Sequence, residues 1–213
     1  MHHHIHQVNN NHFRLLPERA IYWEEQNTLI VADIHLGKAS HFRKSGLPVP
    51  VNYGKKDLDI LGQLIKTEKP KKLLILGDLF HSDANQEWNW FKKWLSEKRN
   101  IEIYLVEGNH DKNIINEASA TNLIVSSSLI MDSFIFTHEP LEEIPKKMYN
   151  FCGHIHPGVR IVGKGRQSLR FPCFWFGKFQ AILPSFGTLT GHVSLSKEDA
   201  SVYAIVEKGI LKV

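Results

Sequence analysis

The stretch from Leu73 to His81 reads LLILGDLFH, and it opens with an uninterrupted apolar run. Such a run is typical of a strand buried on both faces, as in a parallel sheet covered by helices. Gly77 permits a sharp turn where the strand ends. Asp78 is therefore expected at the carboxyl end of a central strand, where open α/β sheets bind their ligands. A helix N-cap is the alternative role for this Asp.

Four further apolar runs end in the same kinds of polar residue. Their ends are Asp33-Ile34-His35, Gly108-Asn109-His110-Asp111, His138 and Gly153-His154-Ile155-His156. Five strands that each deliver Asp, Asn or His predict one shared site. These donors suit Mn, Fe, Zn and similar divalent ions. Neither cysteine belongs to the set, which argues against a structural zinc site.

The composition is that of an ordinary globular protein. The chain has 213 residues, of which 42% are hydrophobic and 23% charged, and we expect one domain over residues 13–213. The net charge of +4 permits a polyanionic partner. Cys152 and Cys173 lie in apolar surroundings and are predicted to be buried thiols. Free thiols indicate a reduced cytoplasmic setting. The sequence contains no long apolar run, so no membrane partner is expected.

The first twelve residues are polar and contain five histidines. We expect residues 1–12 to form a disordered His-rich tail outside the fold. A metal-loading role for the tail is the alternative interpretation.

The order of predicted elements indicates the fold class. A hairpin is expected over residues 13–23 and a strand over Leu29–Ala32. A loop or irregular helix, Lys38–Pro50, and an amphipathic helix, Lys55–Thr67, then cross over to the Leu73 strand, which makes a parallel βαβ unit. Later elements are expected as helices over Asn85–Lys98 and Asn113–Ala120, a run of strands from Leu123 onward, and a hairpin turn at Phe176-Gly177-Lys178-Phe179. Two sheets packed face to face, with helices outside, accommodate both halves in an α/β fold.

Tryptophans are frequent in the second predicted helix. Trp94 belongs to its apolar stripe, whereas Trp88 and Trp90 lie to either side of that stripe. Packing against the sheet is the expected role. A platform on which nucleic-acid bases stack is the alternative.

A site for two metal ions needs a carboxylate that can bridge them and terminal ligands for each. Asp33 and His35 can reach one ion from a turn, and Asp78 is the expected bridge. The remaining donors are the amide oxygen of Asn109 and the imidazoles of His138, His154 and His156. Because His154 and His156 are two residues apart on a bent segment, each can reach a different ion.

These motifs, in this order, resemble those of the calcineurin-like metallophosphoesterases. The resemblance implies a four-layer αββα sandwich, in which helices flank two mixed sheets around a dinuclear metal centre. It implies that one metal is held by Asp33, His35, Asp78 and His156, and the other by Asp78, Asn109, His138 and His154. It also implies that His110 contacts the phosphate and assists departure of the leaving oxygen.

His81 indicates which branch of this superfamily the sequence resembles. Gly77-Asp78-Leu79-Phe80-His81 is similar to the nuclease branch of this superfamily, in which the equivalent His assists the catalytic His. On this resemblance His110 and His81 are the candidate catalytic residues. A polar residue that caps a loop is the alternative for His81.

A closer resemblance, to the ligase-associated DNA metallophosphoesterases or PdeM group, covers nearly the whole chain. It is carried by His35-Leu36-Gly37-Lys38, Phe42-Arg43, Gly46 to Pro50, Arg170 to Trp175 and Leu183 to Gly187. It implies a phosphodiesterase or nuclease linked to DNA repair through a DNA ligase and a helicase. It also implies two metal ions, with Mn expected and Fe, Zn, Ni or Co as alternatives.

Three basic residues beside the predicted site, Lys38, Arg43 and Lys44, favour a DNA substrate, and single-stranded DNA is expected. Two other functions stay open at this point. One is a phosphodiesterase for small molecules such as cyclic nucleotides. The other is a metal-bound scaffold that recruits a ligase or helicase, although the complete ligand set and His110 argue against it.

Overall fold

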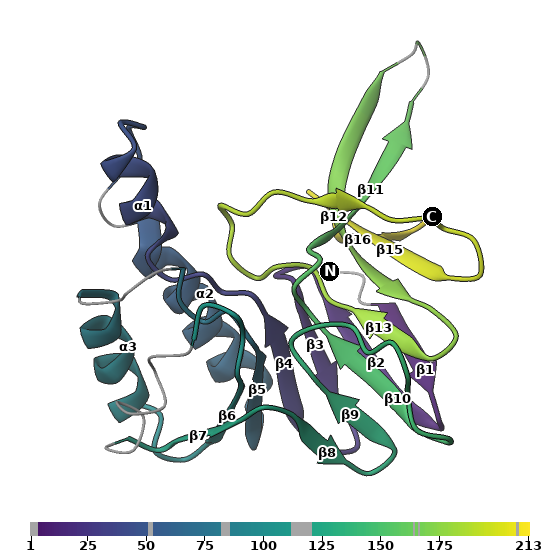
Figure 1. Cartoon of the computed structure of the whole chain (residues 1–213), viewed down its shortest axis with the longest axis horizontal. Coiled ribbons are helices and arrows are strands. Elements are labelled where there is room, and N and C mark those ends of the chain that lie inside the picture. Colours follow the sequence, from purple (N-terminus) through teal and green to yellow (C-terminus); the bar gives the residue numbers. More distant parts are fainter. Residues whose placement is uncertain are drawn as a thin grey trace.

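A computed structural model of the protein describes residues 4–50, 53–81, 86–111, 121–163, 165, 167–207 and 209–213. The predicted helix Asn113–Ala120 lies outside these residues. The described residues form two β-sheets and three helices (Figure 1). The helices are α1 (Lys38–Lys44), α2 (Tyr53–Glu68) and α3 (Gln86–Ser96).

The first sheet has seven strands in sequential order. They are β1 (His4–Val8), β2 (Asn11–Leu16), β3 (Ala20–Trp23), β4 (Thr28–Ala32), β5 (Lys72–Leu76), β6 (Glu102–Val106) and β7 (Leu123–Ser126). Pairing is antiparallel from β1 to β4 and parallel from β4 to β7. Helices α1 and α2 connect β4 to β5, as the predicted βαβ unit requires, and α3 connects β5 to β6.

The second sheet has nine strands and is also mixed. They are β8 (Leu129–Met131), β9 (Phe134–Phe136), β10 (Tyr149–Cys152), β11 (Pro157–Val162), β12 (Ser168–Phe176), β13 (Gln180–Ile182), β14 (Val193–Ser194), β15 (Ser201–Val206) and β16 (Gly209–Lys212). Strand β10 lies parallel to both β9 and β13, whereas β12 is antiparallel to its neighbours.

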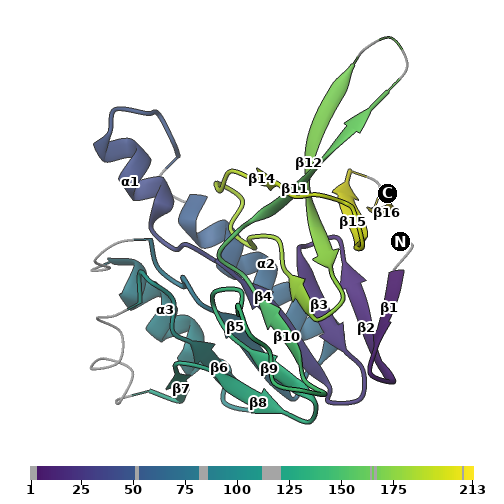
Figure 2. The ribbon, with the colours of Figure 1, turned by 45° about the vertical axis from the view of Figure 1, so that its right-hand side comes forward.

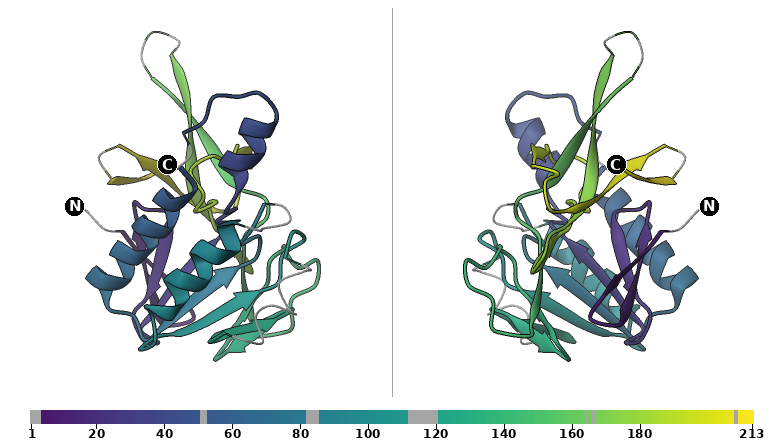
Figure 3. Two further views of the ribbon diagram at one scale, coloured as in Figure 1. Left: turned by 90° about the vertical axis from the view of Figure 1, so that its left-hand side faces the viewer. Right: turned by 90° about the vertical axis from the view of Figure 1, so that its right-hand side faces the viewer.

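Alternate residues of β5 pack into two different cores. Leu73 and Ile75 lie in the core between the first sheet and the helices, and Leu74 and Leu76 lie in the core between the two sheets. All four are fully buried, so this strand is covered on both faces as its apolar run predicts. Figures 2 and 3 show the resulting layers, with α2 and α3 on one face of the first sheet and the second sheet on the other.

The predicted α/β class with two mixed sheets is confirmed, and the described helices α2 and α3 lie on the first sheet (Figure 3). Within the described residues, no helix covers the outer face of the second sheet. The tryptophans of α3 pack rather than stack on a surface, because Trp88 and Trp94 are buried in the helix-side core and Trp90 packs against it. Burial against the sheet removes the base-stacking alternative for Trp88 and Trp94.

The prediction of a disordered tail is wrong for residues 4–12. His4–Val8 is strand β1, which pairs in register with β2 and extends the first sheet. The ring of His6 packs at 4.0 Å from that of Phe176, and Val8 joins the core between the sheets. The free edge of β2 supplies backbone partners, and these contacts hold a segment whose composition is polar.

The run of strands from Leu123 also divides differently from the prediction. Strand β7 completes the first sheet beside β6, and only β8 onward belongs to the second. Both cysteines are buried and free, as predicted. Among the described residues, no helix is long and apolar enough to cross a membrane.

Candidate metal centre

The two sheets bring the carboxyl ends of their parallel strands to one place. Asp33 and Asp78 follow β4 and β5 of the first sheet, and His138 and His154 follow β9 and β10 of the second. Backbone hydrogen bonds connect the segments, from Asp33 N–H to Gly77 O at 3.2 Å and from His35 N–H to Asp78 O at 2.9 Å. His154 N–H donates to Oδ2 of Asp33 at 2.9 Å, which joins the second sheet to the first, so the predicted site residues meet where the two sheets adjoin.

Several of these residues have a left-handed backbone conformation. The φ angles are 53° for Asp33, 51° for His35, 46° for Asp78, 64° for His154 and 51° for His156. Such values are uncommon for residues other than Gly, and they cluster at functional sites where the surrounding structure compensates the strain. They also bend the chain where each strand ends, so that Asp33 and His35 reach the same cluster, whereas His154 and His156 reach different ones.

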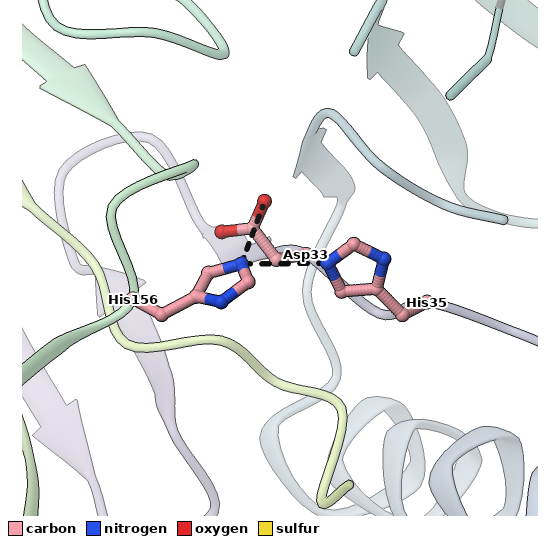
Figure 4. A group of neighbouring side chains, drawn as sticks. All are labelled: Asp33, His35 and His156. Carbon is pink, nitrogen blue, oxygen red and sulfur yellow. Dashed lines mark hydrogen bonds and ion pairs between the residues drawn. The ribbon is translucent and has the colours of Figure 1, made fainter. Parts of the chain in front are cut away.

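The first cluster contains Asp33, His35 and His156 (Figure 4). Nε2 of His156 lies 3.6 Å from Oδ1 of Asp33 and 3.3 Å from Nε2 of His35. Two loops of different sheets thus direct one carboxylate and two imidazoles at a common point. Each of the three residues offers one potential donor atom, and these three atoms lie within 4.8 Å of one another.

The second cluster contains Asp78, His138 and His154. Nδ1 of His138 lies 3.2 Å from the carbonyl oxygen of Leu76, and because a carbonyl only accepts, this nitrogen carries the proton. The lone pair of Nε2 therefore faces the cluster, 3.0 Å from Nδ1 of His154. A ring held by its other N–H in this way is the usual arrangement of a metal-ligating His.

Asp78 lies between the two clusters. Its Oδ2 is 3.8 Å from Nε2 of His35 in the first cluster and 3.6 Å from Nε2 of His138 in the second. Its other oxygen, Oδ1, accepts a hydrogen bond from the backbone N–H of His110 at 3.1 Å. One carboxylate oxygen that faces both clusters is the placement expected of a bridging ligand.

The chemistry of the donors fits divalent cations. Oδ1 of Asp33 is buried and, among the described residues, has no hydrogen-bond partner. Burial raises the pKa of Asp33, and burial, with a contribution from Lys38, lowers the pKa of His35 to about 2. A cation between such groups would stabilise the carboxylate and leave the imidazoles neutral, as metal ligands must be.

Gly77 makes room for the second cluster. It has φ +75°, and a Cβ at this position would overlap the ring of His138. Only Gly accommodates both the left-handed backbone and this close approach. The Gly before Asp78 in the sequence thus belongs to the site as well as to the turn.

Asn109 is exposed, and its amide nitrogen donates a 2.7 Å hydrogen bond to Oε1 of Glu139. The contact lowers the pKa of Glu139 and fixes the amide, so that its oxygen points away from this carboxylate. Glu139 directly follows the cluster residue His138. The structure thus holds Asn109 beside the second cluster, and its role as a ligand stays a prediction.

Asp111 has no role in the sequence analysis, yet it holds two site loops together. Its buried carboxylate accepts hydrogen bonds from the backbone N–H groups of Leu79, Phe80 and Gly108, at 3.2, 3.3 and 3.1 Å. Burial raises its pKa to about 6. The available signal was its place in the Gly108-Asn109-His110-Asp111 motif, where it is the one polar side chain with neither a ligand role nor a catalytic role.

The candidate catalytic histidines lie together beside the first cluster. The ring of His81 is 5.6 Å from that of His110 and 5.6 Å from that of His35. Burial and the nearby Lys38 lower the pKa of His81 to about 4, which favours a neutral ring. His110 is exposed, so it is accessible to a substrate.

The three basic residues predicted to bind substrate differ in their surroundings. Lys38 is half-buried at the start of α1, close enough to Asp33 and Asp78 for their charges to act on its pKa, which burial lowers. Arg43 donates to Ser40 Oγ at 2.8 Å and to the Pro50 carbonyl at 3.3 Å, so it holds its own loop. Lys44 is exposed.

Comparisons with known proteins found one sequence family and several solved structures that resemble this chain. The sequence model of the family described as calcineurin-like phosphoesterase matches residues 27–187. A nuclease MPE from Pseudomonas putida is similar over 100% of both chains, with 26% identity and a TM-score of 0.82. The phosphoesterase Yfce from E. coli aligns over 87% of this chain and 97% of its own, with 16% identity and a TM-score of 0.47. No curated protein sequence matches this chain.

Proposed function

This chain belongs to the calcineurin-like phosphoesterase family and is a metal-dependent phosphoric ester hydrolase, and we propose that its substrates are phosphodiesters in single-stranded DNA. The observation that carries the proposal is the position of His81 against His110, with ring centroids 5.6 Å apart. The full-length similarity to a Pseudomonas putida protein that is described as a nuclease supports it.

The chain's own residues divide the work of hydrolysis between them. The two clusters would hold the divalent cations, and these would supply Lewis acidity that activates water and offsets phosphate charge. His110 donates the proton that the leaving oxygen needs. His81, a neutral ring beside it, orients His110 toward the substrate. Lys38 adds a positive charge at the edge of the site, where the phosphate enters.

We propose Mn as the metal, since imidazole nitrogens together with carboxylate and amide oxygens suit it. Fe, Zn, Ni and Co are the alternatives, because geometry and availability rather than affinity decide between such ions. We further propose that the enzyme acts in DNA repair with a DNA ligase and a helicase, in the cytoplasm. The buried free thiols of Cys152 and Cys173 are compatible with that reducing compartment.

The test compares substrates with the purified protein after reconstitution with each metal in turn. Bis-p-nitrophenyl phosphate, p-nitrophenyl phosphate, a cyclic nucleotide, and single- and double-stranded oligonucleotides are assayed at equal concentration. Asp33→Ala, prepared identically, controls for contaminating nucleases. We expect the diester to be hydrolysed faster than the monoester, and single-stranded DNA to be cleaved.

Each result that contradicts the proposal would indicate a different function. Preference for the monoester would indicate a general phosphatase, and turnover of the cyclic nucleotide without DNA cleavage would indicate a small-molecule phosphodiesterase. The link to repair is tested by co-purification from cells with a ligase or helicase. If neither enzyme is recovered with the tagged protein, the proposed partners are wrong.

A further inference from the structure

Strands β11 and β12 form a two-stranded arm that extends beyond the rest of the second sheet, as Figures 1 and 2 show. We define the arm as Pro157–Val162 together with residues 168–172. It begins at the residue after His156 of the first metal cluster. The metal centre and the arm are therefore parts of one continuous segment.

The two faces of the arm differ in what they contact. Val159 and Ile161 belong to a small core with β15, and their cross-strand partners are Phe171 and Leu169. The opposite face carries Arg160 and Arg170, which are paired directly across the two strands. Opposed residues of an antiparallel pair have Cβ atoms about 5 Å apart. The two positive charges are thus close neighbours.

In the part of the chain that the structure describes, no carboxylate compensates these charges. Both arginines are exposed, and within the described residues neither guanidinium makes an ion pair or a hydrogen bond. Like charges directly opposite each other are destabilising. Two unpaired guanidinium groups on one face present a fork of donors that matches phosphate oxygens.

The arginine face belongs to the strand that directly follows His156 of the first metal cluster. A Cβ on Gly158, on the same face, would lie 2.6 Å from Cβ of His192, so the His192 side chain covers that position. Val193 N–H in turn donates to the carbonyl oxygen of His156 at 3.0 Å. Arg160 is four residues beyond His156, which corresponds to about 13 Å along an extended strand at ~3.3 Å per residue.

We propose that the Arg160–Arg170 face of the arm binds backbone phosphates of the nucleic-acid strand whose scissile phosphodiester occupies the metal centre. The proposal rests on the proposed function and adds to it the path of the substrate. A single strand fits because it carries phosphates at regular intervals on a flexible chain. Val162, exposed on the same face, offers apolar contact to a sugar or base.

The decisive variant is Arg160→Ala/Arg170→Ala. We expect the ratio of kcat/KM for a single-stranded oligonucleotide to that for bis-p-nitrophenyl phosphate to fall by about tenfold or more at low salt. Binding of a fluorescent oligonucleotide with phosphorothioate linkages is measured with metal-loaded protein at several salt concentrations. The slope of log affinity against log salt should become shallower by about 1.4, because each lost phosphate contact contributes roughly 0.7 on a single strand.

Two further variants make the result specific. Lys71→Ala/Arg99→Ala removes the same charge at the other end of the first sheet, before β5 and β6, and should leave binding at the wild-type value. Arg160→Lys/Arg170→Lys keeps the charge and should retain most of the salt dependence while losing some affinity. Equal melting temperatures confirm that all variants are folded.

The outcomes separate this inference from the function on which it rests. If wild-type protein neither binds nor cleaves DNA, the proposed function fails. If wild-type protein does both and the arm variant matches the Lys71/Arg99 control, the arm is not a substrate contact. If the arm variant loses co-purification with a protein partner but cleaves DNA as wild type does, the arm serves that partner and the proposal is wrong.

Discussion

The backbone N–H of His110 donates a hydrogen bond to Oδ1 of Asp78, at 3.1 Å. The other oxygen of Asp78 faces one imidazole of each metal cluster. The proposed bridge and the proposed proton donor are therefore held in one rigid unit. A change at Asp78 should disturb both metal binding and the backbone of His110, whereas a change in the His110 side chain should leave the clusters intact.

Asp78→Asn tests the bridge. Loss of one negative charge between the clusters should weaken both sites, with affinity reduced at least about tenfold at each. Elemental analysis after dialysis against a defined metal concentration measures how much metal the variant retains. Asp59→Asn, an exposed position on α2, is the matched control and should keep full metal content. Two retained equivalents in Asp78→Asn would disprove the bridging role.

His110→Ala tests the proton donor. Metal content should be unchanged, and turnover of DNA should fall by about two to four orders of magnitude because an alkoxide leaving group needs a proton. The loss should be smaller for bis-p-nitrophenyl phosphate, whose leaving group is stable as an anion. Equal losses for both substrates would assign His110 to phosphate binding, and loss of metal would contradict the division between ligands and acid.

His81→Ala tests the neighbouring ring. If His81 acts through His110, its loss should give a weaker form of the same substrate dependence. The double variant should then be little worse than His110→Ala alone, since residues that act as a unit are non-additive. Rates for both substrates are compared across the four proteins. Losses that multiply in the double variant would show that His81 acts independently.

Gly77→Ala tests the close packing behind the second cluster. The left-handed backbone and the overlap with His138 should together lower the free energy of unfolding by more than about 2 kcal/mol. Metal binding should fall with it, because the ring must move. Gly191→Ala is the control, as nothing lies within 4 Å of its added Cβ and its stability should change by less than about 0.5 kcal/mol. Urea denaturation measures the free energy of unfolding of both variants and of the wild-type protein.

Asp111→Ala tests the connection between the Asp78 and Asn109 loops. Three backbone N–H groups would lose their acceptor, at about 1–3 kcal/mol for each group that stays buried and unpaired. Asp111→Asn keeps one acceptor oxygen and should be less destabilised. Unfolding free energies and turnover are measured for both. Wild-type stability in Asp111→Ala would mean that water satisfies these groups and the connection is dispensable.

Replacing Lys38, Arg43 and Lys44 by Ala tests the basic residues of α1. If all three contact phosphates, the slope of log affinity against log salt should become shallower by about 2. Because Arg43 also bonds Ser40 and the Pro50 carbonyl, Lys44→Ala alone separates charge from loop structure. Unchanged DNA affinity in the triple variant would remove the proposed role, and a lowered melting temperature confined to variants of Arg43 would assign it to the loop.

The strands that end at the metal centre, and the polar residues at their ends, could be predicted from the sequence alone. Apolar runs such as Leu73 to Leu76 are local patterns, and burial on both faces follows from their composition. The motif residues were recognisable because Gly and polar side chains interrupt these runs at the same relative position. Because these side chains offer oxygen and imidazole donors, the sequence also indicated the class of metal ion, and no distances were needed for this.

The tertiary structure decided how those residues are grouped. Which imidazole faces which carboxylate depends on the register between two sheets and on left-handed φ angles at Asp33, His35 and Asp78, and neither is encoded in strand periodicity. Likewise, β1 is ordered because β2 and Phe176 lie beside it, and the alignment of Arg160 with Arg170 depends on cross-strand register. Such contacts join residues far apart in the chain, so local composition carries no record of them.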